Sequence, residues 1–134
     1  MRAIKITSYG DADVLKFSDA EPTPTQGKGQ ALVKIHAAGV NFVDIYQRQG
    51  RYAVGTPYIP GLEGAGVVEE VDDRTAGFSR GDRVAYTGHL GSYSEYVAVS
   101  TDKLIKLPRG MSFEEGAALP AATAPLTRPR TRRR

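Results

Sequence analysis

Short stretches in which apolar and polar residues alternate recur along the chain, and they predict a mainly β fold. The clearest is residues 31–38, where apolar side chains at positions 33, 35 and 37 indicate a half-buried strand. We expect a first hairpin and then a series of further strands, over residues 1–8 and 14–17, 31–38, 67–71, 83–86, 93–99 and 103–107. Many short strands with turn residues between them are typical of a sandwich or barrel.

Short helices are predicted at two places between or after the strands. Asn41 can accept a hydrogen bond from the first turn of a helix over residues 42–48, and a carboxylate early in that helix favours its N-terminus. Ser112 and Glu115 fit a capping box that opens a second helix. We expect this second helix to stop near Pro120.

Two segments show no periodic pattern. Residues 50–66 are rich in glycine and proline, which predicts an irregular loop shaped for function. Residues 121–134 mix threonine, proline and arginine, and we expect them to be disordered. The five arginines of this tail support nonspecific contact with nucleic acid at most, because no recognition element accompanies them. A change of reading frame is the simpler explanation of the tail.

The composition is that of a globular domain with a hydrophobic core. The chain has 134 residues, of which 40% are apolar and 25% charged, so we expect one domain rather than two. No apolar run has the length of a signal peptide or a membrane span, and we therefore expect a cytoplasmic protein. The absence of cysteine excludes disulfides, iron–sulfur clusters, thiolate zinc sites and cysteine nucleophiles.

Five sequence blocks identify a family by their order. They are AGVNFVD at 38–44, PGLEGAGVV at 60–68, GDRVAY at 81–86, GSYSEY at 91–96 and the Leu–Pro pair at 107–108. Over residues 1–120 the chain resembles the zinc-independent NAD(P)H:quinone oxidoreductases related to zeta-crystallin, within the medium-chain dehydrogenase family. The resemblance implies that residues 1–120 form a GroES-like (chaperonin-10-like), partly open β-barrel with short helices.

The nucleotide-binding part of these enzymes has no counterpart in the sequence. No G-x-G-x-x-G pattern follows a predicted strand and opens a helix, so we expect the Rossmann domain to be absent. The resemblance implies that the intact protein transfers hydride from NADPH to a quinone or an enone and forms a homodimer. We expect the present chain to be a truncated form that is inactive by itself.

One position in the block at 60–68 sets this chain apart from the wider alcohol dehydrogenase family. The family carries a zinc-binding histidine there, and this chain has Leu62. The resemblance therefore implies an enzyme without zinc or another metal. A quinone or an enone needs a Lewis acid less than an alcohol does, because its oxygen delocalises the negative charge that develops.

Five residues are candidates for the functional site. The resemblance implies that Asn41, Tyr46 and Tyr52 shape the acceptor pocket, and that Asn41, Asp44 and Arg48 contact the cofactor. Asn41 can hydrogen-bond the nicotinamide or the carbonyl of the substrate. The tyrosines offer an aromatic face to a flat quinone and a hydroxyl to the developing oxyanion.

Each candidate also has a purely structural interpretation. Asn41 could simply cap the helix, and the tyrosines could be partly buried in the core. Asp44 and Arg48 stand four residues apart, so an ordinary helical ion pair could explain them. Glu63 follows the position of the missing zinc ligand, and we expect it to hold the loop through backbone amides.

The alternative to an enzyme is a noncatalytic GroES-like binding or structural module, kept for its association with partners. The candidate site residues argue against this alternative, because a module of that kind does not need them. The sequence indicates no specific nucleic-acid partner and no membrane partner.

Overall fold

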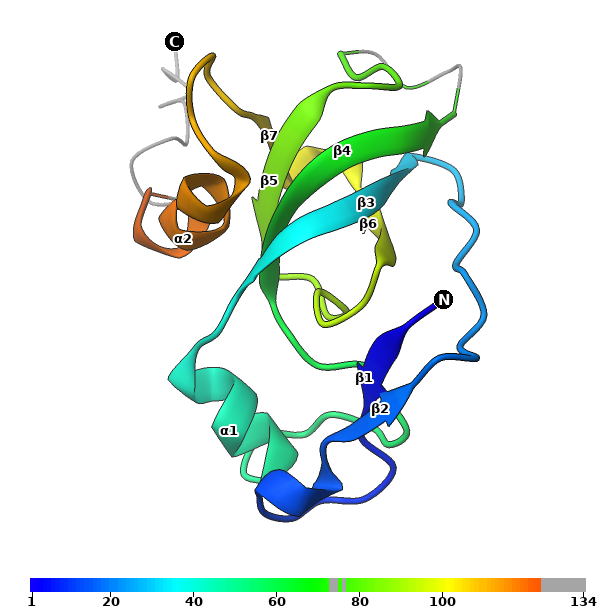
Figure 1. Cartoon of the computed structure of the whole chain (residues 1–134), viewed down its shortest axis with the longest axis vertical. Helices are drawn as coiled ribbons and strands as arrows, with labels where there is room; N and C mark the ends of the chain where they lie inside the picture. Colours follow the sequence, from blue (N-terminus) through cyan, green and yellow to red (C-terminus); the bar gives the residue numbers. More distant parts are fainter. Residues whose placement is uncertain (73–74, 76, 124–134) are drawn as a thin grey trace, which may run out of the picture.

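The computed structural model describes residues 1–72, 75 and 77–123 (Figure 1). In this part of the chain, short strands outweigh the helices, and the prediction of a mainly β fold with short helices is confirmed. The elements in chain order are β1 (Ala3–Lys5), η1 (Ala12–Val14), β2 (Lys16–Ser18), β3 (Gln30–Gly39), α1 (Phe42–Arg48), β4 (Glu63–Val71), β5 (Arg83–Thr87), β6 (Tyr96–Ser100), η2 (Thr101–Lys103), β7 (Leu104–Lys106) and α2 (Phe113–Thr123), where η marks a single 3-10 turn.

The main sheet is antiparallel and has the strand order β6-β3-β4-β5-β7. The long strand β3 pairs with β6 on one side and with β4 on the other. Within the described residues the sheet stays open instead of closing into a complete barrel, with α2 beside it and α1 beyond the end of β3 (Figure 1). The predicted partly open β architecture is therefore confirmed.

The hydrophobic core lies on the inner face of this sheet. The alternation predicted for residues 31–38 places Ala31 and Val33 in the core, both fully buried. They share it with buried residues from the other strands, namely Val68, Val84, Tyr86, Val97, Val99 and Leu104. Because burying one valine or leucine side chain contributes about 1.5–3 kcal/mol, this cluster supplies much of the stability of the fold.

Strand β4 begins earlier than the sequence predicts. The expectation of a loop as far as residue 66 is wrong, because residues 63–66 pair with β3 and place Gly66 opposite Ile35. A Cβ atom at Gly66 would overlap the carbonyl oxygen of Lys34 and lie 2.8 Å from its carbonyl carbon. Glycine here permits two strands to approach closely beside a β-bulge, and does not mark a loop.

The N-terminal strands form a separate antiparallel pair, as predicted. β1 is shorter than the expected strand over residues 1–8, and η1 lies in the connection to β2. Ile4 N–H donates a hydrogen bond to the carbonyl of Tyr93 at 2.9 Å, and Ala3 forms a β-bridge nearby. Residues 93–95 thus lie against the N-terminal segment, which is why β6 begins at Tyr96 and not at residue 93.

Helix α2 opens with the capping box that the sequence predicts. Glu115 N–H donates to Ser112 Oγ at 3.1 Å, and Ser112 N–H donates to Glu115 Oε2 at 3.2 Å. The expected stop near Pro120 is wrong, because the helix continues to Thr123. Proline removes one backbone donor, but its fixed φ fits a helix, and the alanines that follow are strong helix formers.

The predicted disorder of residues 121–134 has two outcomes. It is wrong for residues 121–123, which belong to α2. Residues 124–134 lie outside the described part of the chain. The predicted domain boundary after residue 120 stays a prediction.

The start of α2 is anchored to the sheet through the ring of Phe113. This ring stacks on His36 of β3, with centroids 4.4 Å apart and an interplanar angle of 21°. The guanidinium of Arg83, from β5, lies 4.4 Å from the centroid of the same ring and donates to the carbonyl of Met111 at 2.7 Å. Side chains from both β3 and β5 therefore fix the first turn of α2 to the sheet.

Loss of the cap should weaken this helix measurably. We expect Ser112→Ala to lower the free energy of unfolding by about 1 kcal/mol, because the N–H of Glu115 loses its acceptor. Urea denaturation followed by circular dichroism measures the change. Ser112→Asp keeps an acceptor at this position and should remain near the wild type. An equal loss in both variants would show that the hydrogen bond of the cap does not contribute to the free energy of unfolding.

Candidate functional site

The first turn of α1 is held by a capping box. Asn41 is the N-cap residue, with extended backbone angles of φ −130° and ψ 155°. Its backbone N–H donates to Asp44 Oδ2 at 3.0 Å, and the N–H of Asp44 donates to the backbone carbonyl of Asn41 at 3.0 Å. The predicted capping position of Asn41 is confirmed, and Asp44 is buried as part of the same turn.

The side chain of Asn41 is also bound to the start of β4. Its Nδ2 donates to Glu63 Oε1 at 2.8 Å, and Glu63 is only 3% exposed. The expectation that Glu63 holds the loop through backbone amides is wrong, because its described hydrogen bond goes to a side chain. The missing side chain at Gly39 makes room for this carboxylate: a Cβ atom there would lie 2.5 Å from Glu63 Cδ.

Tyr93 is a third member of this cluster, and reasoning from the sequence did not single it out. Its hydroxyl donates to Asp44 Oδ2 at 2.8 Å, across 49 residues of chain. Burial, the hydrogen bond to Asp44 and the charge of that carboxylate raise the pKa of Tyr93 well above its ordinary value. The GSYSEY block marked the segment, but nothing in it distinguished this tyrosine from its neighbours.

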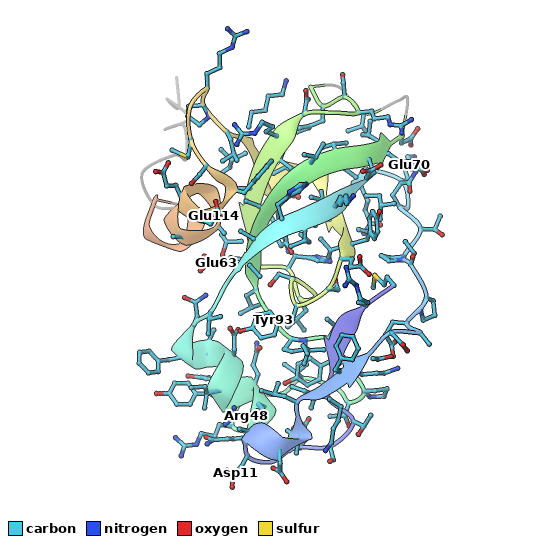
Figure 2. The ribbon with its side chains drawn as sticks, in the orientation of Figure 1. Asp11, Arg48, Glu63, Glu70, Tyr93 and Glu114 are labelled. Carbon is cyan, nitrogen blue, oxygen red and sulfur yellow. The ribbon has the colours of Figure 1, made fainter. Side chains whose placement is uncertain are left out.

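A pocket of about 330 Å³ lies between the end of β3 and helix α2, next to this cluster. Small residues form most of its wall, and its polar lining comes from Asn41, Glu63 and Glu114. Figure 2 shows Glu63 at the sheet and Glu114 on α2. The full lining is Ala37, Ala38, Gly39, Val40, Asn41, Glu63, Glu114, Ala117 and Ala118. Segments that are far apart in sequence therefore build the pocket.

The two candidate tyrosines lie outside this lining, with Tyr46 in α1 and Tyr52 in the segment that follows it. Tyr46 is 36% exposed and Tyr52 is 55% exposed, so the structural interpretation of core burial is wrong for Tyr52. Their ring centroids are 6.0 Å apart in an edge-to-face arrangement. Val40 and Phe42 are also exposed, at 77% and 76%. Four large apolar or aromatic side chains between residues 40 and 52 are thus accessible to solvent.

Asp44 and Arg48 do not form the ion pair that their spacing allows. Asp44 Oδ2 is occupied by Tyr93 and by the backbone of Asn41. Arg48 Nε donates instead to the carbonyl of Gly10 at 3.3 Å, and Gly10 N–H donates to the carbonyl of Arg48 at 3.0 Å. Arg48 therefore connects α1 to the N-terminal segment and is not brought into the cluster around Asn41.

In residues 1–72, 75 and 77–123, no group of three or more His, Asp or Glu side chains is arranged to hold a metal ion. No helix in that part of the chain is long and apolar enough to cross a membrane.

Comparison with known sequences identifies relatives of the chain. Residues 27–109 match the family described as "Alcohol dehydrogenase GroES-like domain". The quinone oxidoreductase of Mus musculus is 39% identical over 122 residues, which cover 89% of this chain and 37% of the mouse protein. The quinone oxidoreductase of Pseudomonas aeruginosa is 43% identical over 120 residues, covering 88% of this chain and 37% of that protein.

A solved structure shows the same architecture. The Escherichia coli quinone oxidoreductase complexed with NADPH superimposes with a TM-score of 0.85 at 32% sequence identity, covering 96% of this chain and 41% of that one. The chain thus spans well under half the length of these relatives.

Proposed function

Because the chain belongs to the family of alcohol dehydrogenase GroES-like domains, we propose that it forms the acceptor-binding side of an NAD(P)H:quinone oxidoreductase. The predicted GroES-like fold and the medium-chain dehydrogenase relationship are confirmed by the family match and by the quinone oxidoreductase relatives. The observation that carries the proposal is the placement of Asn41 in the lining of a pocket between the end of β3 and α2, with its amide bound to Glu63.

NADPH is the proposed reductant of the whole protein, and it supplies a hydride when bound. The pocket fits the nicotinamide end of NADPH, because an amide donor and small side chains line it. Of the three residues proposed for cofactor contact, Asn41 is the one that lines the pocket. We propose that Asp44 acts indirectly by holding Asn41, and that Arg48 acts by fixing α1 to Gly10.

The proposed chemistry places negative charge on the oxygen of the acceptor. Transfer of a hydride to the quinone or enone would leave negative charge on its oxygen, as a hydroquinone anion or an enolate, until a proton from water neutralised it. An N–H of Asn41 can stabilise that oxygen, and the hydroxyls of Tyr46 and Tyr52 can add further donors. Their edge-to-face rings offer an apolar surface to a flat acceptor.

We propose that this reaction proceeds without zinc. The chain contains no cysteine, and Leu62 stands where the wider family has a histidine ligand. The described residues also lack a cluster of three possible ligands. Such a set of donors does not fit a catalytic zinc site, which needs three protein ligands. Homodimer formation and a cytoplasmic location stay predictions.

The proposal can be tested by joining the chain to the remaining part of the Escherichia coli quinone oxidoreductase. We expect NADPH-dependent reduction of a quinone or an enone by this chimera. Asn41→Ser keeps a cap for α1 but loses the amide donors, and should lower kcat/KM for the acceptor by tenfold or more, by analogy with the loss of an oxyanion donor, which costs about 100-fold or more.

Gln49→Ala is the matched control, because Gln49 is an exposed residue at the end of the same helix. It should leave the kinetics of the chimera unchanged. A chimera that binds NADPH yet reduces neither acceptor would contradict the proposal and favour the noncatalytic module. An active chimera that is insensitive to Asn41→Ser would show that the site is assigned wrongly.

A further inference from the structure

The protein itself uses one of the two N–H groups on the Asn41 side chain. A carboxamide has two N–H donors and one carbonyl oxygen. One N–H is donated to Glu63 Oε1 at 2.8 Å, whereas the N–H of Asp44 donates to the backbone carbonyl of Asn41 at 3.0 Å. The second side-chain N–H is therefore a donor left for a ligand in the pocket that Asn41 lines.

Glu63 decides the orientation of this amide. A carboxylate oxygen of Glu63 accepts this hydrogen bond, so the nitrogen end of Asn41 faces Glu63. Turning the amide over would place two oxygen atoms against each other. The backbone of Gly39 lies directly against the Glu63 carboxylate, and Glu63 is almost fully buried. The carboxylate of Glu63 is therefore packed against β3 on the side away from solvent.

We infer that Glu63 is a positioning residue, which acts through Asn41 and turns one N–H of its amide toward ligands that offer a carbonyl oxygen. With Glu63 holding one N–H of Asn41, the other N–H stays available as a donor. A ketone oxygen of a quinone or an enone can use that donor. The choice of ligand rests on the proposed function, but the orientation of Asn41 by Glu63 does not depend on it.

The first test follows the amide of Asn41 in the full chain by NMR. Asn41 is the only asparagine, so selective ¹⁵N-asparagine labelling shows its side chain without overlap. In the wild type we expect two well separated Nδ2 proton shifts, one of them with an NOE to the side-chain methylenes of Glu63. Absence of this NOE would overturn the inference without the need for any variant.

Two substitutions then separate orientation from mere packing. In Gly39→Ala the new methyl group meets the flexible side chain of Glu63 and should push its carboxylate away from Asn41. The difference between the two Nδ2 proton shifts should then become smaller. Glu63→Gln keeps an acceptor oxygen of the same shape and should preserve the separation. Unchanged shifts in Gly39→Ala would show that Glu63 does not hold the amide.

The second test titrates 2-cyclohexen-1-one into the labelled chain. We expect the Nδ2 proton that is not bonded to Glu63 to shift, with an affinity about fivefold weaker in Gly39→Ala, the equivalent of about one hydrogen bond. Glu63→Gln should bind like the wild type. Equal affinities in wild type and Gly39→Ala, or an enone that moves neither proton, would overturn the use of the Asn41 amide as a donor to a carbonyl.

The outcomes also separate this inference from the proposed function. An inactive chimera together with an oriented Asn41 amide would reject the quinone oxidoreductase proposal and leave the orientation by Glu63 intact. If the chimera is active but the Nδ2 proton shifts of Asn41 do not change in Gly39→Ala, only the role of Glu63 is rejected and the proposed function stands.

Discussion

Replacing Gly66 with alanine is expected to lower the free energy of unfolding by about 3 kcal/mol or more, at the upper end of the cost of overpacking. The added methyl group would collide with the backbone of Lys34 in the neighbouring strand, and backbone atoms in the centre of a sheet cannot move aside as a side chain can. Urea denaturation of the full chain measures the loss through a lower transition midpoint.

Gly55→Ala is the control for this substitution. An alanine Cβ at Gly55 would meet no other atom within 4 Å, and this glycine lies in the loop before β4. Its midpoint should stay at or above the wild-type value, because alanine restricts the unfolded chain more than glycine does. A Gly66→Ala midpoint equal to that of the wild type would contradict the close approach of β3 and β4.

Stability should also fall steeply at alkaline pH, because the pKa values of two tyrosines are raised, buried Tyr86 and half-buried Tyr93. Burial raises the pKa of Tyr86, and burial together with Asp44 raises that of Tyr93. Above pH of about 10 the unfolded chain releases these protons while the folded chain retains them. The stabilisation is complete below that pH and is lost as the pH rises toward the folded values, by about 1.4 kcal/mol per pH unit for each tyrosine.

Tyr93→Phe isolates one of the two contributions. The slope of unfolding free energy against pH above 10 should become shallower by about 1.4 kcal/mol per unit, the contribution of one proton. At neutral pH the same variant should be destabilised by about 1.5–3 kcal/mol, since buried Asp44 loses a charge-assisted hydrogen bond. A slope equal to that of the wild type would show that Tyr93 ionises normally in the folded chain.

Local pattern was sufficient to predict most of the fold. The alternation around Val33 predicts β3, and the Ser112–Glu115 spacing predicts the capping box of α2, because both signals depend on neighbours in sequence. The prediction failed at Gly66, where glycine serves a strand and not a turn. Nothing local distinguishes the two uses, because the atom that requires the glycine belongs to Lys34 on another strand.

Of the contacts around the candidate site, the sequence predicted only the local one. The pattern at the helix start placed Asn41 correctly as the N-cap of α1, and the structure adds its partner Glu63 and, through Asp44, Tyr93. These partners are 22 and 49 residues apart in sequence from the side chains that they contact. The ion pair of Asp44 and Arg48 failed for the opposite reason, because tertiary partners displaced a plausible local contact.

The anchoring of α2 by Phe113 has a consequence for the pocket. One wall of the pocket belongs to the sheet and α1, and the other belongs to α2, so the pocket exists only while the helix is docked. Helix docking and ligand occupancy are thus linked by mass action. A ligand at 100 times its Kd would favour the docked helix by about 2.7 kcal/mol. Slower amide hydrogen exchange in α2 would then indicate that a ligand occupies the pocket.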